Sequence, residues 1–86
     1  MTIDSTIHSL IDHEFAAAYA KHNGKTPRSH GVGDATSLVV LVEEVGEVAR
    51  AMTYDEGDID NLAAELIQVA TMAAAWAERL IVRGDA

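Results

Sequence analysis

The run LVVLVEEVGEVA, residues 38–49, sets three glutamates among apolar residues and constrains the fold more than any other feature. At about 100° per residue, a helix would place Glu43, Glu44 and Glu47 within one sector of roughly 100°. The only base close to this acidic sector is Arg50, whereas a solvated helix face usually alternates acidic with basic residues. Like charges flanked by core residues repel one another and resist desolvation. In a chain with few bases, a bound divalent cation is the remedy that we favour.

A second set of polar residues could pack against the acidic sector. Asn61, Glu65 and Gln68 follow i, i+4, i+7 spacing in an otherwise apolar segment. Packing this line against the acidic sector would gather four carboxylates and an amide around one point. Oxygen ligands of this kind suit a hard cation, Mg²⁺ or Mn²⁺, better than zinc, which favours His and Cys.

Apolar residues recur at helical spacing, and no alternating β-rich run occurs, so the fold class is all-α. Eighty-six residues make one domain, spanning 1–86. Capping residues and turn signals set the expected bounds of three helices: from Thr2 or Asp4 to Lys21, from a cap at Asp34 or Thr36 to about Thr53, and from a cap at Asp58 to about Val82, before Gly84. Residues 54–57 are expected to form a short turn.

The composition predicts an oligomer. The chain is 49% apolar and has no cysteine that could form a disulfide to stabilise a small core. This apolar content exceeds what so short a monomer hides easily.

The formal net charge of −8 argues against nucleic acid or an anionic membrane as a partner. No basic segment followed by an apolar one opens the sequence, and no apolar run approaches the ~18 residues of a membrane span. We expect a soluble, cytoplasmic protein.

Residues 22–33 contain three glycines and the only proline, which is loop chemistry. Lys21, Lys25 and Arg28 supply half of the six Lys and Arg residues of the chain. In so acidic a protein, this segment is a candidate phosphate-contacting loop or lid, with an ordinary polar connection as the alternative. No Gly-Lys-Ser/Thr closes a Walker-type pattern.

Two further residues, Glu14 and Gly46, each allow two interpretations. Glu14 lies inside the apolar stripe of the first helix, where it either extends to solvent or a base, or faces the acidic sector or a substrate hydroxyl. Gly46 lies mid-helix, where glycine costs about 1 kcal/mol relative to alanine. It allows close helix approach or opens space beside the carboxylates.

The segment Glu43-Glu44-Val45-Gly46-Glu47, followed after a helical spacer by Glu65-Leu66-Ile67-Gln68, resembles the MazG-like all-α nucleotide pyrophosphohydrolases. The signature of that family is EExxE, a helical spacer, then ExxD. The resemblance spans residues 38 to 80, and the preceding helix and loop fit the family layout.

The resemblance implies a three-helix chain that assembles through a helical bundle into a homodimer or tetramer. It also implies Mg²⁺-dependent hydrolysis of a nucleoside triphosphate to the monophosphate and pyrophosphate, with a house-cleaning role. Carried over by position, the metal ligands would be Glu44, Glu47, Glu65 and Gln68. Glu43 would be an outer ligand or the base that orients the attacking water. Candidate substrate contacts, taken from the first helix, the loop and the third helix, are Glu14, Lys25, Arg28 and Asn61.

Gln68 departs from this family pattern, which has Asp there. A neutral amide removes one negative charge from the site and weakens binding of a second cation most. A nucleotide-binding or regulatory protein that does not hydrolyse its ligand is therefore an alternative. A plain helical interaction module leaves the glutamates unexplained, and a ferritin-type di-iron site is set aside because no Glu-x-x-His occurs.

Overall fold

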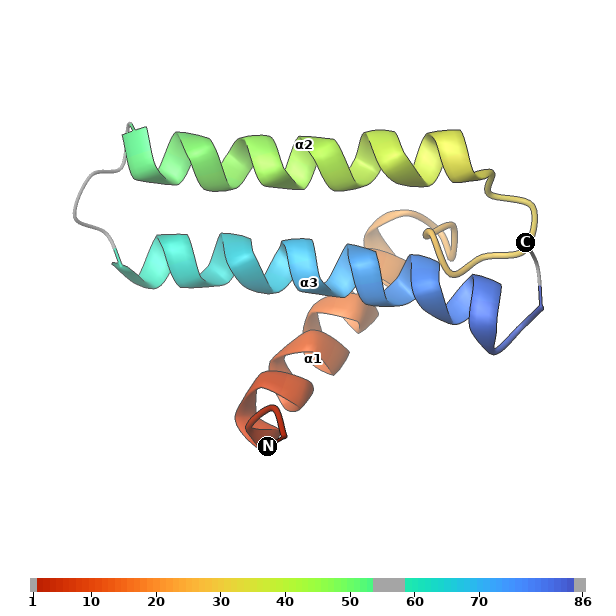
Figure 1. Ribbon diagram of the computed structural model, residues 1–86, viewed down its shortest axis with the longest axis horizontal. Coiled ribbons are helices and arrows are strands. Elements are labelled where there is room, and N and C mark those ends of the chain that lie inside the picture. The colour runs from red at the N-terminus through yellow and green to blue at the C-terminus, as the bar shows by residue number, and fades with distance from the viewer. Residues whose placement is uncertain (1, 54–58, 85–86) are drawn as a thin grey trace.

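The computed structural model describes residues 2–53 and 59–84. This part of the chain contains no strand and consists of α1 (Ser5–Lys21), α2 (Asp34–Thr53) and α3 (Ile59–Ile81) (Figure 1). The all-α prediction with three helices is confirmed. The expected turn at 54–57 and the cap at Asp58 lie outside the described residues. None of the three helices has the length and apolar content needed to cross a membrane.

Local signals define both ends of α1. The carboxylate of Asp4 accepts a 2.8 Å hydrogen bond from the backbone N–H of Thr6, which caps the helix and lowers the pKa of Asp4. At the other end, the N–H of Gly24 donates to the carbonyl of Tyr19 over 2.8 Å. Gly24 has φ +82°, and an added Cβ would lie 3.2 Å from Cζ of Tyr19. The positive φ therefore favours glycine here, and a Cβ would also require the exposed Tyr19 ring to shift slightly.

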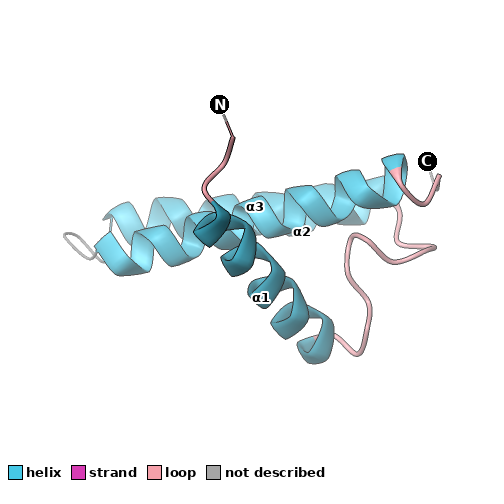
Figure 2. Cartoon of the chain, turned by 90° about the horizontal axis from the view of Figure 1, so that it is seen from below, coloured by secondary structure: helices cyan, strands magenta, loops and turns pink. Residues whose placement is uncertain are grey.

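The helices α2 and α3 run side by side in opposite directions, and α1 crosses them steeply (Figures 1 and 2). Within the described residues, α1 packs on α3 and makes no comparable contact with α2. The two packed helix pairs are therefore α2 with α3 and α1 with α3. Within the described residues, one side of α2 is therefore exposed, including the side chains of Leu38, Val42 and Val45.

The core of the described residues is small. Its buried apolar side chains are Ala51, Met72 and Ala75. The radius of gyration is 13.4 Å, against about 12 Å for a compact domain of this length. Much of the apolar content thus lies on the surface, as the composition led us to expect.

A buried arginine ties the loop and α2 to α3. Arg79 is 2% exposed, and its Nε donates to the carbonyl of Pro27 over 2.8 Å. Its Nη2 donates to Asp34 Oδ1 over 2.8 Å and to Ser37 Oγ over 3.3 Å. The indole N–H of Trp76 donates to the same Asp34 oxygen over 2.9 Å, and these two partners lower the pKa of Asp34. Three chain segments are held by this one network.

The network corrects the prediction for the start of the second helix. α2 begins at Asp34 itself, so neither Asp34 nor Thr36 precedes it as a cap. The carboxylate of Asp34 instead accepts hydrogen bonds from α3. The backbone N–H and the hydroxyl of Ser37 both donate hydrogen bonds to the carbonyl of Gly33, each over 3.0 Å.

The loop between α1 and α2 is an ordered connection. Ser29 Oγ donates to the carbonyl of Gly24 over 2.8 Å and accepts from the N–H of Thr26 over 2.9 Å. Thr26 and Pro27 are buried. With Arg79 holding Pro27 from α3, the loop forms a fixed wall, which disfavours the lid interpretation.

Candidate functional site

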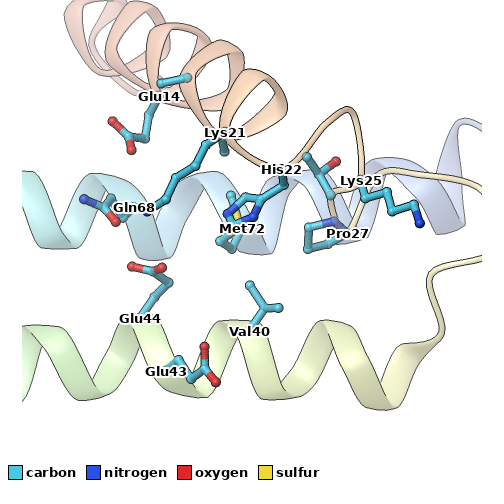
Figure 3. Close-up of a pocket in the computed structure, with 13 residues that line it drawn as sticks. Glu14, Lys21, His22, Lys25, Pro27, Val40, Glu43, Glu44, Gln68 and Met72 are labelled. Atoms are coloured by element: carbon cyan, nitrogen blue, oxygen red, sulfur yellow. The ribbon is translucent and has the colours of Figure 1, made fainter.

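A cavity of about 350 Å³ lies where the end of α1 and the following loop meet α2 and α3 (Figure 3). Its acidic and amide side is formed by Glu14, Glu43, Glu44 and Gln68. Its basic side is formed by Lys21, His22 and Lys25. The remaining lining residues are Ala17, Ala18, Thr26, Pro27, Val40 and Met72. Acidic and basic residues therefore line one shared cavity.

Helical spacing explains how each element contributes. On α2, Val40, Glu43 and Glu44 are spaced i, i+3, i+4, so they share one face. On α3, Gln68 and Met72 are spaced i, i+4 in the same way. Figure 3 shows Glu44 reaching from α2 toward α3, with Gln68 on the opposite side of the gap.

Glu44 is the electrostatically strained member of the site. It is half-buried, and its Oε2 is buried without a hydrogen-bond partner among the described residues. Burial raises the pKa of Glu44, and the charges of Glu65, Glu47, Glu14 and Glu43 raise it further. The carboxylate thus lacks the basic partner that would compensate for its desolvation.

Glu65 has the same deficiency on the facing helix. Its Oε2 is also buried and has no hydrogen-bond partner in the described part of the chain. Glu65 does not line the cavity, but its charge contributes to the raised pKa of Glu44. Glu47 is exposed and lies outside the cavity lining, and it acts on Glu44 in the same way.

The predicted ligands do not form a finished coordination shell. Across residues 2–53 and 59–84, no group of three or more His, Asp or Glu side chains is placed so that it could hold a metal ion. Side-chain rotation, or carboxylates from outside a single chain, would be needed to complete one. The fit to a hard cation rests on the chemistry of the donors: Glu44 and Glu65 each offer an unpartnered buried oxygen, and Gln68 offers an amide oxygen beside them.

Of the four candidate substrate contacts, two line the cavity and two do not. Lys25 and Glu14 line the cavity, so Glu14 takes the position facing the acidic sector. Arg28 does not line it: its guanidinium lies 4.1 Å from the centroid of the Phe15 ring and 3.7 Å from Glu78 Oε2. Asn61 is half-buried on α3 and does not line this cavity either.

Lys21 belongs to the predicted phosphate-contacting segment, although it was not among the named substrate contacts, and no role was predicted for the side chain of His22. Both line the cavity. The signal was available in the spacing of residues 14, 17, 18 and 21, which puts Lys21 on the same face of α1 as Glu14. For His22, which follows the helix, no comparable pattern exists.

A second cavity, of about 480 Å³, lies between α1 and the first half of α3. Its lining is mostly apolar and includes Ile7, Leu10, Leu66 and Ile67. Glu14 lines both cavities, so the two spaces adjoin at this carboxylate.

Comparisons of the chain with models of protein families, with curated proteins and with solved structures find no match in any of the three.

Proposed function

We propose that the chain is a Mg²⁺-dependent nucleoside triphosphate pyrophosphohydrolase of the MazG-like kind, acting in the cytoplasm with a house-cleaning role. The observation that carries the proposal is one cavity that the acidic residues Glu43 and Glu44 line together with the basic residues Lys21 and Lys25. A metal ion suits the acidic side, and the phosphates of a nucleotide suit the basic side. The volume of this cavity, about 350 Å³, lies at the lower end of the range for small-molecule sites.

The residues that would hold the cation are Glu44, Glu47, Glu65 and Gln68. Their donors are all oxygens, as Mg²⁺ and Mn²⁺ require. The unpartnered oxygens of Glu44 and Glu65 support this assignment, because a cation would supply the charge compensation that no base among the described residues provides. When bound, Mg²⁺ would offset phosphate charge and lower the pKa of a coordinated water.

The chain's own residues would supply positioning and proton transfer. Glu43 is exposed and lines the cavity, so its carboxylate can orient the attacking water and accept its proton. The water oxygen forms a bond to phosphorus, the anhydride bond between the first and second phosphates breaks, and pyrophosphate leaves. Lys21 and Lys25 would bind the outer phosphates and stabilise the charge on the leaving group.

The adjoining apolar cavity suits the nucleobase. A flat heterocycle gains from apolar contact with Ile7, Leu10 and Ile67, while Glu14 at the junction can accept a hydrogen bond from a sugar or base donor. This arrangement assigns the choice of base to α1 and the first half of α3.

One observation favours a second candidate function. Gln68 lines the cavity where a carboxylate would give a stronger metal site, so the chain can bind a nucleotide without hydrolysing it. Such a protein would be a sensor or regulatory subunit.

Titration calorimetry with Mg²⁺ and a panel of nucleoside triphosphates, followed by product analysis, tests both candidates. Hydrolysis predicts binding together with equal amounts of nucleoside monophosphate and pyrophosphate. Binding without pyrophosphate release supports the regulatory alternative. Glu44→Gln should abolish the metal-dependent heat, whereas Glu78→Gln, at the Arg28 ion pair away from the cavity, should not. If wild-type protein binds neither Mg²⁺ nor any nucleotide, both candidates are wrong.

A further inference from the structure

The lining that α1 gives to the two cavities changes character at Glu14. Ile7 and Leu10, which precede Glu14 on the helix, line the apolar cavity and not the other one. Ala17 and Lys21, which follow Glu14, line only the cavity that holds the acidic and basic residues. Of all the residues that line these two cavities, Glu14 alone lines both. The junction between the two spaces is therefore marked by one carboxylate.

The spacing along α1 matches the order of groups in a nucleotide. Glu14 and Lys21 are seven residues apart, which puts them on one face of the helix and about 10 Å apart along its axis. A 5′-triphosphate chain can bridge this separation, and both side chains lie on the side of α1 that faces α3 (Figure 3). Ala17 and Ala18 line the cavity between them and are small enough to leave room for a ligand. With the base in the apolar cavity and the phosphates at Lys21, the sugar lies at Glu14.

Glu14 has acceptor oxygens to offer at this junction. It is half-buried, so part of its contact with water is lost. Within residues 2–53 and 59–84, no hydrogen bond or ion pair engages its carboxylate. An ionised carboxylate accepts hydrogen bonds and cannot donate them, so its complement is a ligand with donors.

We propose that Glu14 selects ribonucleoside triphosphates over 2′-deoxyribonucleoside triphosphates by accepting hydrogen bonds from the 2′- and 3′-hydroxyl groups. The two hydroxyls of ribose stand on neighbouring carbons, and the two oxygens of one carboxylate can accept from both. A 2′-deoxyribose offers a single donor and leaves one oxygen unpaired at a half-buried site, which costs affinity. This inference rests on the proposed function, because that proposal places the base and the phosphates in the two cavities.

Recognition of the base by Glu14 fits the structure less well. The base would then occupy the junction, and the apolar cavity of about 480 Å³ beside it would hold no part of the ligand. A Glu14 that read the base would also discriminate between bases and not between sugars. Comparing both kinds of pair separates the two roles.

The test measures kcat/KM for pyrophosphate release with ATP against dATP and with CTP against dCTP, at one Mg²⁺ concentration. The charge of Glu14 also helps to raise the pKa of Glu44, so a variant can alter metal binding as well. The ratio of ribo- to deoxynucleotide within one variant cancels that effect. In wild-type protein both ratios should be roughly tenfold or more, since a charge-assisted hydrogen bond is lost with the 2′-hydroxyl.

Glu14→Ala should bring both ratios close to one. The matched control is Asp12→Ala, because Asp12 is an exposed acidic residue of α1 that lines neither cavity. Asp12→Ala should keep the wild-type ratios. If Glu14→Ala fails to fold, Glu14→Gln decides, since it keeps the shape of the side chain and should still lower both ratios. 3′-Deoxy-ATP should lose specificity in wild-type protein and much less in the Glu14 variants.

The outcomes separate this inference from the proposed function. Equal wild-type values for ribo- and deoxynucleotides, or ratios that the Glu14 variants leave unchanged, overturn the inference while hydrolysis stands. A Glu14-dependent preference between ATP and CTP, with no preference between sugars, overturns it in favour of base recognition. If nucleotides bind without being hydrolysed, the same ratios are taken from dissociation constants measured by calorimetry. Protein that binds no nucleotide overturns both proposals.

Discussion

Glu44 on α2 and Glu65 on α3 each hold a buried carboxylate oxygen without a hydrogen-bond partner among the described residues, and the charge of Glu65 helps to raise the pKa of Glu44. Two like charges thus oppose each other across the main helix pair of the fold. An arrangement that disfavours folding in this way is common where residues are held ready for a ligand.

The raised pKa of Glu44 predicts how stability without metal depends on pH. From about pH 4.5, the ordinary Glu pKa, up through the raised value, the folded chain binds more protons at this site than the unfolded chain. The contribution of Glu44 to the unfolding free energy therefore falls as the pH rises. In EDTA, the stability gained by Glu44→Gln over wild type should grow through this window and then level off in thermal melts.

Asp34 provides a control of opposite sign. Its pKa is lowered by Trp76 and Arg79, so its contribution is present above the ordinary Asp pKa and is lost as the pH falls through the lowered value. Asp34→Asn should therefore lose stability relative to wild type at neutral pH and converge with it in acid. If both variants give the same sign at neutral pH, the electrostatic assignment is wrong.

Magnesium should raise the melting temperature, more so with a nucleotide present. A ligand that binds only the folded chain stabilises it by about 2.7 kcal/mol at a hundred times its Kd. Each kcal/mol raises Tm by about 4–8 °C in a domain of this size. Glu78→Gln should respond as wild type does. Identical melting curves in EDTA and in Mg²⁺ would show that the acidic sector is not a metal site.

Gln68→Asp should tighten Mg²⁺ binding, because it adds a charged oxygen ligand where the amide now lines the cavity. Any pyrophosphohydrolysis should persist or increase, most visibly at limiting metal. Glu47→Gln removes charge with little change of shape and should suppress turnover without unfolding the chain. Calorimetry on both variants separates the roles, and an unchanged affinity in Gln68→Asp would remove Gln68 from the ligand set.

Arg79→Met should destabilise the fold by about 1–3 kcal/mol in urea denaturation, since the carbonyl of Pro27 loses its buried donor. Nucleotide affinity should fall as well, because the loop that carries Lys25 is no longer held. Arg83→Met, at an exposed position, should change stability by no more than about 0.5 kcal/mol. Equal effects at the two positions would contradict the anchoring role of Arg79.

Local signals in the sequence were sufficient for much of the fold. The cap at Asp4 and the Asn-Gly pair at 23–24 bound α1, and apolar spacing located all three helices. The acidic sector was recognisable because its neighbours are apolar. The charge of Glu65 does raise the pKa of Glu44, as expected if the two helices face each other.

What the sequence did not reveal depends on contacts between distant segments. Arg79 lies 52 positions from Pro27 and 45 from Asp34, and no periodicity connects residues across such a span. Arg28 contacts Phe15 and Glu78 instead of lining the cavity, and these contacts also join segments that are distant in the sequence. The steep crossing of α1, which creates both cavities, likewise depends on packing that helical spacing does not encode.

The position of Arg79 in the chain also affects the order in which the protein can be completed during translation. The ribosome makes the loop and α2 well before it makes the arginine that holds them. Until α3 has emerged, a nascent chain carries Lys25 on an unfastened loop and exposes the whole length of α2. A chain interrupted before α3 would contain the segments of α1 and α2 and most of the acidic residues, yet not the arginine that holds the cavity wall. Ligand binding during synthesis is therefore expected to begin late, after the third helix has docked.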